Sequence, residues 1–192
     1  GGRLTGSANA DEAVRYTAEQ LRKFADSVSL QLVEVPHWIR GPRERAQIIN
    51  LPQGIKQDLN VTALGNSIGT GSEGVSGEVI EVQSLDEVRN LGKSKISGKI
   101  VFYNRPMDPT MLRTFFAYGG AVDQRVNGPA VAAENGAIAT IVRSMTTLTD
   151  NVPHTGTTRY KEGIPKIPAV AVSTRHADFL SKFIKRGKTE VY

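Results

Sequence analysis

Three histidines, His37, His154 and His176, are the side chains of this chain best suited to bind a metal ion. His176 stands two residues before Asp178, and a histidine and an aspartate can serve one ion together. A hydrolytic metal site needs about three protein ligands, however, and neither a second ligand cluster nor a cysteine accompanies the pair. The pair also opens an amphipathic helix instead of following a buried strand. We therefore predict a helix start at the surface here, and no metal ligand.

Ser67 lies in a Gly-x-Ser-x-Gly sequence, from Gly65 to Gly69, which is typical of the nucleophile of one class of serine hydrolases. That nucleophile needs a strand before the serine, a sharp turn at it and a helix after it. The alternation over residues 59–64 predicts the strand, but the glycine-rich residues 65–74 oppose the helix. We predict a hinge-like connection at 65–74 and no catalytic residue, and keep a serine hydrolase as an alternative.

The tract Ser144–Ser173 contains a long loop, called the flap below, that leads into an apolar run at 169–172. Loops of this length without their own structure are usually functional or disordered, and the apolar runs on both sides favour an ordered flap. Its turn offers an imidazole, a hydroxyl and a glycine backbone, followed by side chains able to pair with a carboxylate or to stack. The candidate contact residues are His154, Thr155, Gly156, Arg159 and Tyr160. The alternative is an exposed loop in which His154 caps local backbone.

The composition is that of a globular protein of one domain or slightly more, with 192 residues, 39% hydrophobic and 22% charged. No apolar run approaches the roughly 18 residues of a membrane span, so we expect no membrane partner. The net charge of +5 comes from scattered basic residues, and the aromatic residues do not interleave with them. We therefore expect no nucleic-acid partner.

The first third of the chain predicts one helix and a few strands. Asn9 and Glu12 form a capping-box pattern, and apolar residues recur at helical spacing from position 14 to 28. Strands are expected at 30–35, 46–51 and 59–64. These elements are too thin to close a core, so we expect their apolar faces to need cover from elsewhere, or the segment to be mobile or self-associating.

The remaining chain alternates strands with helices, which predicts a partly parallel α/β layer. Strands are expected at 79–82, 99–103, 137–142, 167–172 and 189–192. Helices are expected at 84–91, from 127 to 135 and from 173 to 184, and one more should begin at Asp108-Pro109 and bury Leu112, Phe115 and Phe116. A glycine at position 92 should stop the first of them.

His37, Trp38 and Arg40 form a polar and aromatic cluster that contains the only tryptophan. We expect either a contact with another domain or subunit, or an aromatic residue at a strand end that covers the edge of the core.

Segments spread over the chain resemble the carboxypeptidase Q-like family, which are two-zinc exopeptidases. The segments Val152–Gly156 and Gly163–Ser173 resemble the family's protease-associated domain. Gly2–Ser7 with the helix after it resembles the opening of the catalytic domain, and residues 63–74 resemble the crossing between the two domains. Shorter matches stand at 35–41, 98–101, 136–137 and 143–144, whereas Gly119–Asn127 cannot be aligned.

The resemblance implies a mixed α/β fold: a protease-associated domain of the swivelling β/β/α type at 69–192, truncated at its end, after an incomplete catalytic-domain segment at 1–68. The family's zinc ligands and catalytic glutamate lie beyond this part. The resemblance thus implies no cofactor here, two zinc ions in the parent enzyme, and a non-catalytic piece that shapes access of a peptide or dipeptide substrate.

It also implies a secreted or periplasmic protein and is compatible with a homodimer. The flap would then face the peptidase cleft. A self-standing protein-interaction module of the same fold is the alternative.

Overall fold

The computed structural model describes residues 2–192, which form two compact units, one ending at Arg40 and one comprising Gly41–Tyr192. The first unit holds helix α1 (Ala8–Leu21), capped by Ser7, whose hydroxyl accepts from the Ala10 amide at 3.2 Å. The predicted cap at Asn9 is therefore wrong, because Asn9 lies inside the helix. The predicted strand at 30–35 is also wrong: these residues are irregular, and their apolar side chains are exposed.

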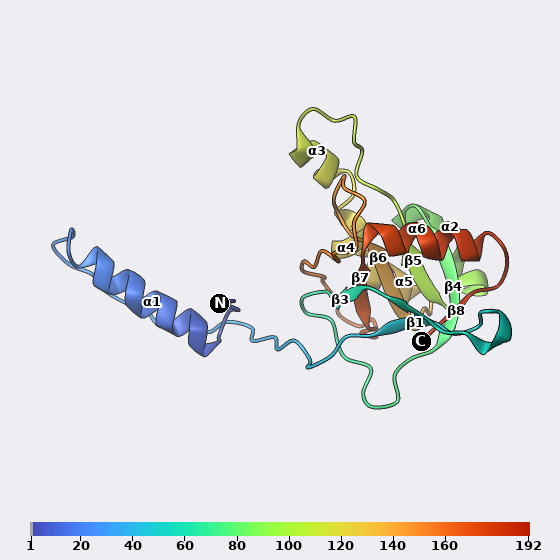
Figure 1. The fold of residues 1–192 in the computed structure, drawn as a ribbon. Coiled ribbons are helices and arrows are strands. Elements are labelled where there is room, and N and C mark those ends of the chain that lie inside the picture. The colour runs from blue at the N-terminus through green and yellow to red at the C-terminus, as the bar shows by residue number, and fades with distance from the viewer. Residues whose placement is uncertain (1) are drawn as a thin grey trace. The chain divides into compact units, whose positions relative to one another are not determined.

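The second unit is built on one eight-stranded sheet of order β2-β1-β8-β4-β5-β6-β7-β3 (Figure 1). Neighbours among β4, β5, β6 and β7 run parallel, and the other pairs are antiparallel. The strands are β1 (Ala46–Ile48), β2 (Gln57–Leu59), β3 (Val61–Ala63), β4 (Gly77–Val82), β5 (Ile100–Tyr103), β6 (Ala139–Arg143), β7 (Ala169–Val172) and β8 (Glu190–Val191).

A corner at Asn60 replaces the single strand predicted at 59–64. β2 and β3 stand at opposite ends of the strand order, yet only Asn60 separates them in the chain. The two ends of the sheet must therefore lie close together, and the sheet is strongly curled. The start of the last helix holds this corner, because the Ser173 amide donates to the Asn60 carbonyl at 3.0 Å.

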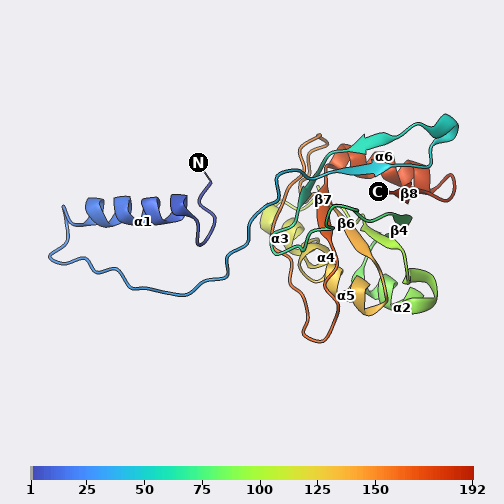
Figure 2. The ribbon, with the colours of Figure 1, turned by 90° about the horizontal axis from the view of Figure 1, so that it is seen from below.

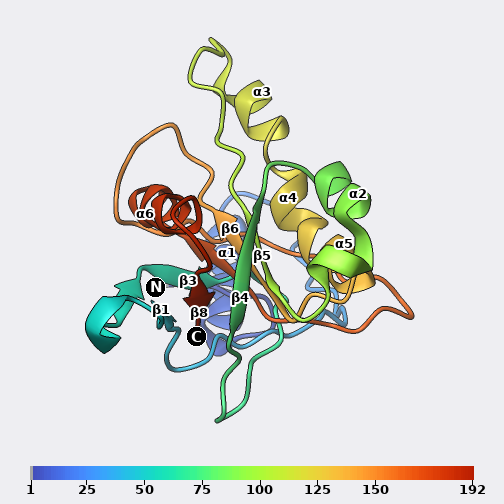
Figure 3. The same cartoon turned by 90° about the vertical axis from the view of Figure 1, so that its right-hand side faces the viewer.

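Helices cover both faces of the sheet. They are α2 (Leu85–Ile96), α3 (Thr114–Gly119), α4 (Asp123–Val126), α5 (Gly128–Glu134) and α6 (Thr174–Ile184), with a 3-10 turn η1 at Pro52–Gly54. Figures 2 and 3 show α2 and α5 on one side of the sheet and α6 on the other. Two apolar clusters correspond to these sides. Val88, Val101 and Ala132 belong to one cluster, and Phe102 and Leu180 belong to the other.

Two helix predictions need correction. No helix begins at Asp108, because its carboxylate accepts from the amide and hydroxyl of Thr110 and closes a local turn, which also lowers the pKa of Asp108. The helix that does form, α3, leaves Phe115 and Phe116 exposed. The stop predicted at Gly92 is confirmed in part: Gly92 interrupts α2 with a non-helical backbone, at a φ of 60°, but helical residues resume after it up to Ile96.

The predicted α/β class is confirmed. Strands alternate with helices from Gly77 to Ile184, as expected. None of the helices within residues 2–192 is long and apolar enough to cross a membrane.

Candidate functional site

The turn of the flap is tied to the sheet through Ser144. The His154 amide donates to the Ser144 hydroxyl at 2.8 Å, and this hydroxyl donates to the Val172 carbonyl of β7 at 2.7 Å. The ring of His154 is half-buried. His154 is therefore held in the turn through its backbone amide.

The flap turn, His154–Gly156, also packs along the segment that follows β3. The Thr155 hydroxyl donates to the Ala63 carbonyl at 2.7 Å, and the Gly65 amide donates to the Gly156 carbonyl at 2.8 Å. Two residues on, the Thr158 amide donates to the Gly65 carbonyl at 2.9 Å. These bonds form a short parallel bridge, so the flap is an ordered part of the unit.

Arg159 and Tyr160 have different surroundings. The Tyr160 hydroxyl donates to the Ile167 carbonyl at 2.6 Å and accepts from the Ile68 amide at 3.1 Å. This phenol therefore links the flap to the glycine-rich segment 65–74. The Arg159 amide donates to the Val126 carbonyl at 2.9 Å, while its side chain is exposed. Of these two residues Arg159 is the more exposed, and its contact with a ligand stays a prediction.

Ser67 is a structural residue and not a nucleophile. Its hydroxyl accepts from the Ala169 amide at 2.8 Å and donates to the Ile68 carbonyl at 2.9 Å, and the side chain is buried. Residues 68–76 form no helix. The strand–turn–helix geometry of a serine hydrolase is thus missing. The hinge interpretation is wrong for residues 65–67, which pack against β7 and the flap.

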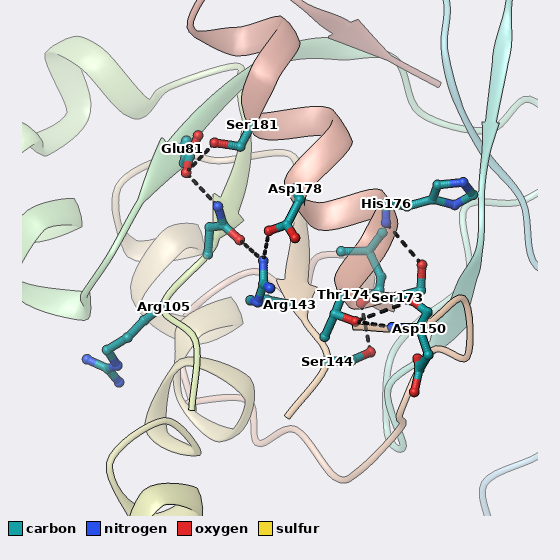
Figure 4. A network of polar contacts seen from close by, with 12 residues as sticks. Glu81, Arg105, Arg143, Ser144, Asp150, Ser173, Thr174, His176, Asp178 and Ser181 are labelled. Atoms are coloured by element: carbon teal, nitrogen blue, oxygen red, sulfur yellow. Dashed lines mark hydrogen bonds and ion pairs between the residues drawn. The ribbon is translucent and has the colours of Figure 1, made fainter. Parts of the chain in front are cut away.

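A polar network that the sequence did not reveal lies at the carboxyl ends of β4, β5 and β6, beneath α6 (Figure 4). Arg143 donates to Asp178 at 2.6 Å and to the Asn104 side-chain oxygen at 3.2 Å. Asn104 and Ser181 both donate to Glu81, at 2.6 and 3.0 Å. Ligands of α/β proteins often bind at the carboxyl ends of the parallel strands, so the position of these polar residues at strand ends was the one clue to the network in the sequence. Here most of the groups bond to one another, although the buried Nε of Arg143 has no hydrogen-bond partner, and the network joins α6 to the sheet.

The His-x-Asp pair is split by this network. Asp178 turns to Arg143, whereas His176 Nδ1 accepts from the Asn60 amide at 2.6 Å. Burial, with a smaller effect from Arg175, lowers the pKa of His176. The predicted helix start is confirmed by the Ser173 cap of α6. Within residues 2–192 no three His, Asp or Glu side chains gather in a way that could hold a metal ion.

The cluster of His37, Trp38 and Arg40 lies in an irregular segment of the first unit, so the strand-end interpretation of Trp38 is wrong. The Arg40 guanidinium carbon stands 5.0 Å from the centre of the Trp38 ring, and His37 Nδ1 is 3.2 Å from the Thr5 carbonyl oxygen. The role of this cluster as an interdomain or subunit contact stays a prediction.

Comparison with solved structures finds this α/β layer as a part of longer peptidases. A peptidase M28 precursor from Shewanella amazonensis SB2B is 34% identical and superimposes with a TM-score of 0.90, over 100% of this chain and 42% of its own. An aminopeptidase from Aneurinibacillus sp. strain AM-1, at 18% identity and a TM-score of 0.64, shares the fold. No family model matches the chain.

The curated relatives that match the chain are carboxypeptidase Q proteins. Carboxypeptidase Q of Xenopus laevis is 40% identical over 188 residues, and that of Homo sapiens is 35% identical over the same length. Each match covers 97% of this chain but only 37% of the relative. The chain is thus a homologue of carboxypeptidase Q, as the sequence motifs indicated, and it spans little more than a third of those proteins.

Proposed function

We propose that this chain is the part of a zinc-dependent exopeptidase that shapes substrate access to the active site, without carrying the catalytic residues itself. The observation that carries the proposal is the homology to carboxypeptidase Q along 97% of the chain. The solved peptidase that superimposes on the whole chain supports the same class. Substrates would be peptides or dipeptides, and the protein would be secreted or periplasmic like the family it resembles.

The zinc of the proposed enzyme would be held outside these residues. A solved relative of 18% identity is described as a zinc aminopeptidase of Bacillus subtilis, which motivates the choice of metal. The side chains of residues 2–192 do not fit a zinc site, because their carboxylates and imidazoles do not converge. We therefore assign no step of peptide hydrolysis to this chain.

The proposed division is a catalytic-domain segment at 1–68 and a protease-associated domain at 69–192. The compact unit of the structure begins earlier, at Gly41, because β1, β2 and β3 complete the curled sheet. In this proposal residues 41–68 carry the chain from one domain to the next while packing with the second.

The flap turn is the part that we propose faces the peptidase cleft. The backbone of the turn is held by hydrogen bonds, and it carries the half-buried His154. The exposed Arg159 lies three residues after the turn. An ordered turn with these groups can limit substrate length or contact a carboxylate at little entropic cost.

The test is His154→Ala in the longer protein that the proposal requires. Loss of one hydrogen bond to substrate costs about 1 kcal/mol, so KM should rise roughly threefold to tenfold with little change in kcat. Lys95→Ala, an exposed change on α2, is the control and should leave both constants unchanged. Identical kinetics for His154→Ala and the control would exclude the flap from the cleft.

A self-standing interaction module is the second candidate, because residues 41–192 hold their own apolar clusters on both faces of the sheet. The reading frame decides between the two candidates. A continuation of some hundreds of residues with zinc-ligand motifs supports the peptidase, whereas a stop codon directly after Tyr192 supports the module.

A further inference from the structure

Arg125 of α4 lies against the flap turn at Thr155 and Gly156. Its side chain is 8% exposed, and its guanidinium lies 5.4 Å from the centre of the Tyr118 ring. One terminal nitrogen donates to the Tyr118 hydroxyl, and the other lies 3.5 Å from the Thr155 carbonyl oxygen. The guanidinium therefore stands between an aromatic ring and the flap turn.

Gly156 leaves room for this guanidinium. A Cβ atom at position 156 would lie 2.5 Å from Arg125 Nε and 2.6 Å from Nη1, closer than such atoms pack. The backbone of Gly156 has no positive φ, so its conformation does not demand glycine. A side chain at position 156 would therefore have to displace the guanidinium of Arg125.

The charge of Arg125 is held without a carboxylate. Arg105 pairs with Asp123 and Arg143 pairs with Asp178, but Arg125 forms no ion pair with any residue in the described part of the chain. Its Nε is buried and has no hydrogen-bond partner. Burying a charge in this way is costly, and an apolar side chain would fill the space at a lower cost. Stability alone does not explain an arginine at this position.

We propose that Arg125 is a positioning residue that clamps the flap turn in place, through Tyr118 on one side and Gly156 on the other. The planar guanidinium suits this role, because one terminal nitrogen donates to the Tyr118 hydroxyl while the other reaches the Thr155 carbonyl. The clamp fixes the backbone on which His154 and Arg159 are carried. Its effect on substrate binding rests on the proposed function, in which the flap lines the cleft.

A double-mutant cycle in the 192-residue chain tests the clamp. Gly156→Ala should displace the guanidinium and loosen the turn. Hydrogen exchange of the Thr158 amide, which donates to the Gly65 carbonyl, should then become about tenfold faster or more. In the Arg125→Ala background the same change should have less than about a threefold effect, because the obstructing group is gone. Gly69→Ala, where a Cβ would meet nothing within 4 Å, is the control and should be silent in both backgrounds. Independent effects of the two substitutions would overturn the clamp.

Kinetics of the longer protein separate this inference from the proposed function. Arg125→Lys keeps the charge but loses the planar group, so it should raise KM about as much as Arg125→Ala and leave kcat nearly unchanged. Arg89→Ala on α2 removes an exposed arginine and serves as the control. A normal KM in Arg125→Ala beside a raised KM in His154→Ala would overturn the clamp alone. Normal KM values in both variants, together with the expected coupling between Gly156→Ala and Arg125→Ala in hydrogen exchange, would instead refute the proposal that the flap lines the cleft.

Discussion

At the scale of single residues, His176 shows how one hydrogen bond selects a charge state. Its Nδ1 accepts the Asn60 amide at the corner between β2 and β3, and only an unprotonated nitrogen can accept. Burial adds to this by lowering the pKa of the imidazole below its ordinary value near 6.5. A residue that looked like half of a metal site therefore stabilises the curl of the sheet.

The lowered pKa of His176 predicts a pH-dependent stability. Above about pH 7 the ring is neutral in both states, and its contribution is complete. As the pH falls through about 6.5 the unfolded chain takes up a proton first, so the free energy of unfolding should decline. His176→Ala should lose about 1 kcal/mol at pH 8 and flatten this decline in urea titrations. His37→Ala, in the first unit, is the control and should keep the decline. An unchanged slope in His176→Ala would contradict the assignment.

At the scale of elements, α6 and α3 show opposite relations to the sheet. α6 buries Leu180 completely, at 0% exposure, against the strands, and Arg143 and Glu81 hold its polar side. The loop before α3 projects from the sheet (Figure 3) and leaves Leu112 fully exposed, at 102%, and α3 itself leaves Phe115 exposed. Two apolar patterns that look alike in the sequence thus contribute differently to the free energy of unfolding.

The same substitution in these two places should measure this difference. Leu180→Ala should lower the free energy of unfolding by about 2 to 5 kcal/mol, because it opens a cavity between α6 and the sheet. Leu112→Ala should change it by less than about 0.5 kcal/mol. Urea denaturation followed by circular dichroism provides both values. Comparable losses at the two sites would mean that α3 packs against the body of the unit in solution.

At the scale of the whole molecule, the two units differ in what stabilises them. The second unit has apolar clusters on both faces of its sheet. In α1 only Ala18 is buried, and Phe24 and Leu32 are exposed. A single helix of 14 residues is marginally stable by itself in water. These exposed side chains fit the expectation that apolar faces in the first third of the chain need cover from elsewhere.

Hydrogen exchange should therefore divide the isolated chain at Arg40. We expect the amides of α1 to exchange at least about a hundredfold faster than those of β5 and β6, because few buried contacts oppose local opening. In the longer protein the α1 amides should become protected while those of β5 change little. Strong protection of α1 in the isolated 192-residue chain, measured at concentrations where it is monomeric, would contradict this expectation.

Local patterns in the sequence determined the alternating strands and helices between Gly77 and Ile184 and the Ser84 and Ser173 helix starts. These depend on residues within a turn or a strand of one another, so spacing alone expresses them. Tertiary structure alone decided the rest. Ser67 became structural through Ala169, 102 positions away, and Arg125 met Thr155 across 30 positions. Strand 30–35 failed to form because a strand needs a partner, and no spacing of its own residues supplies one.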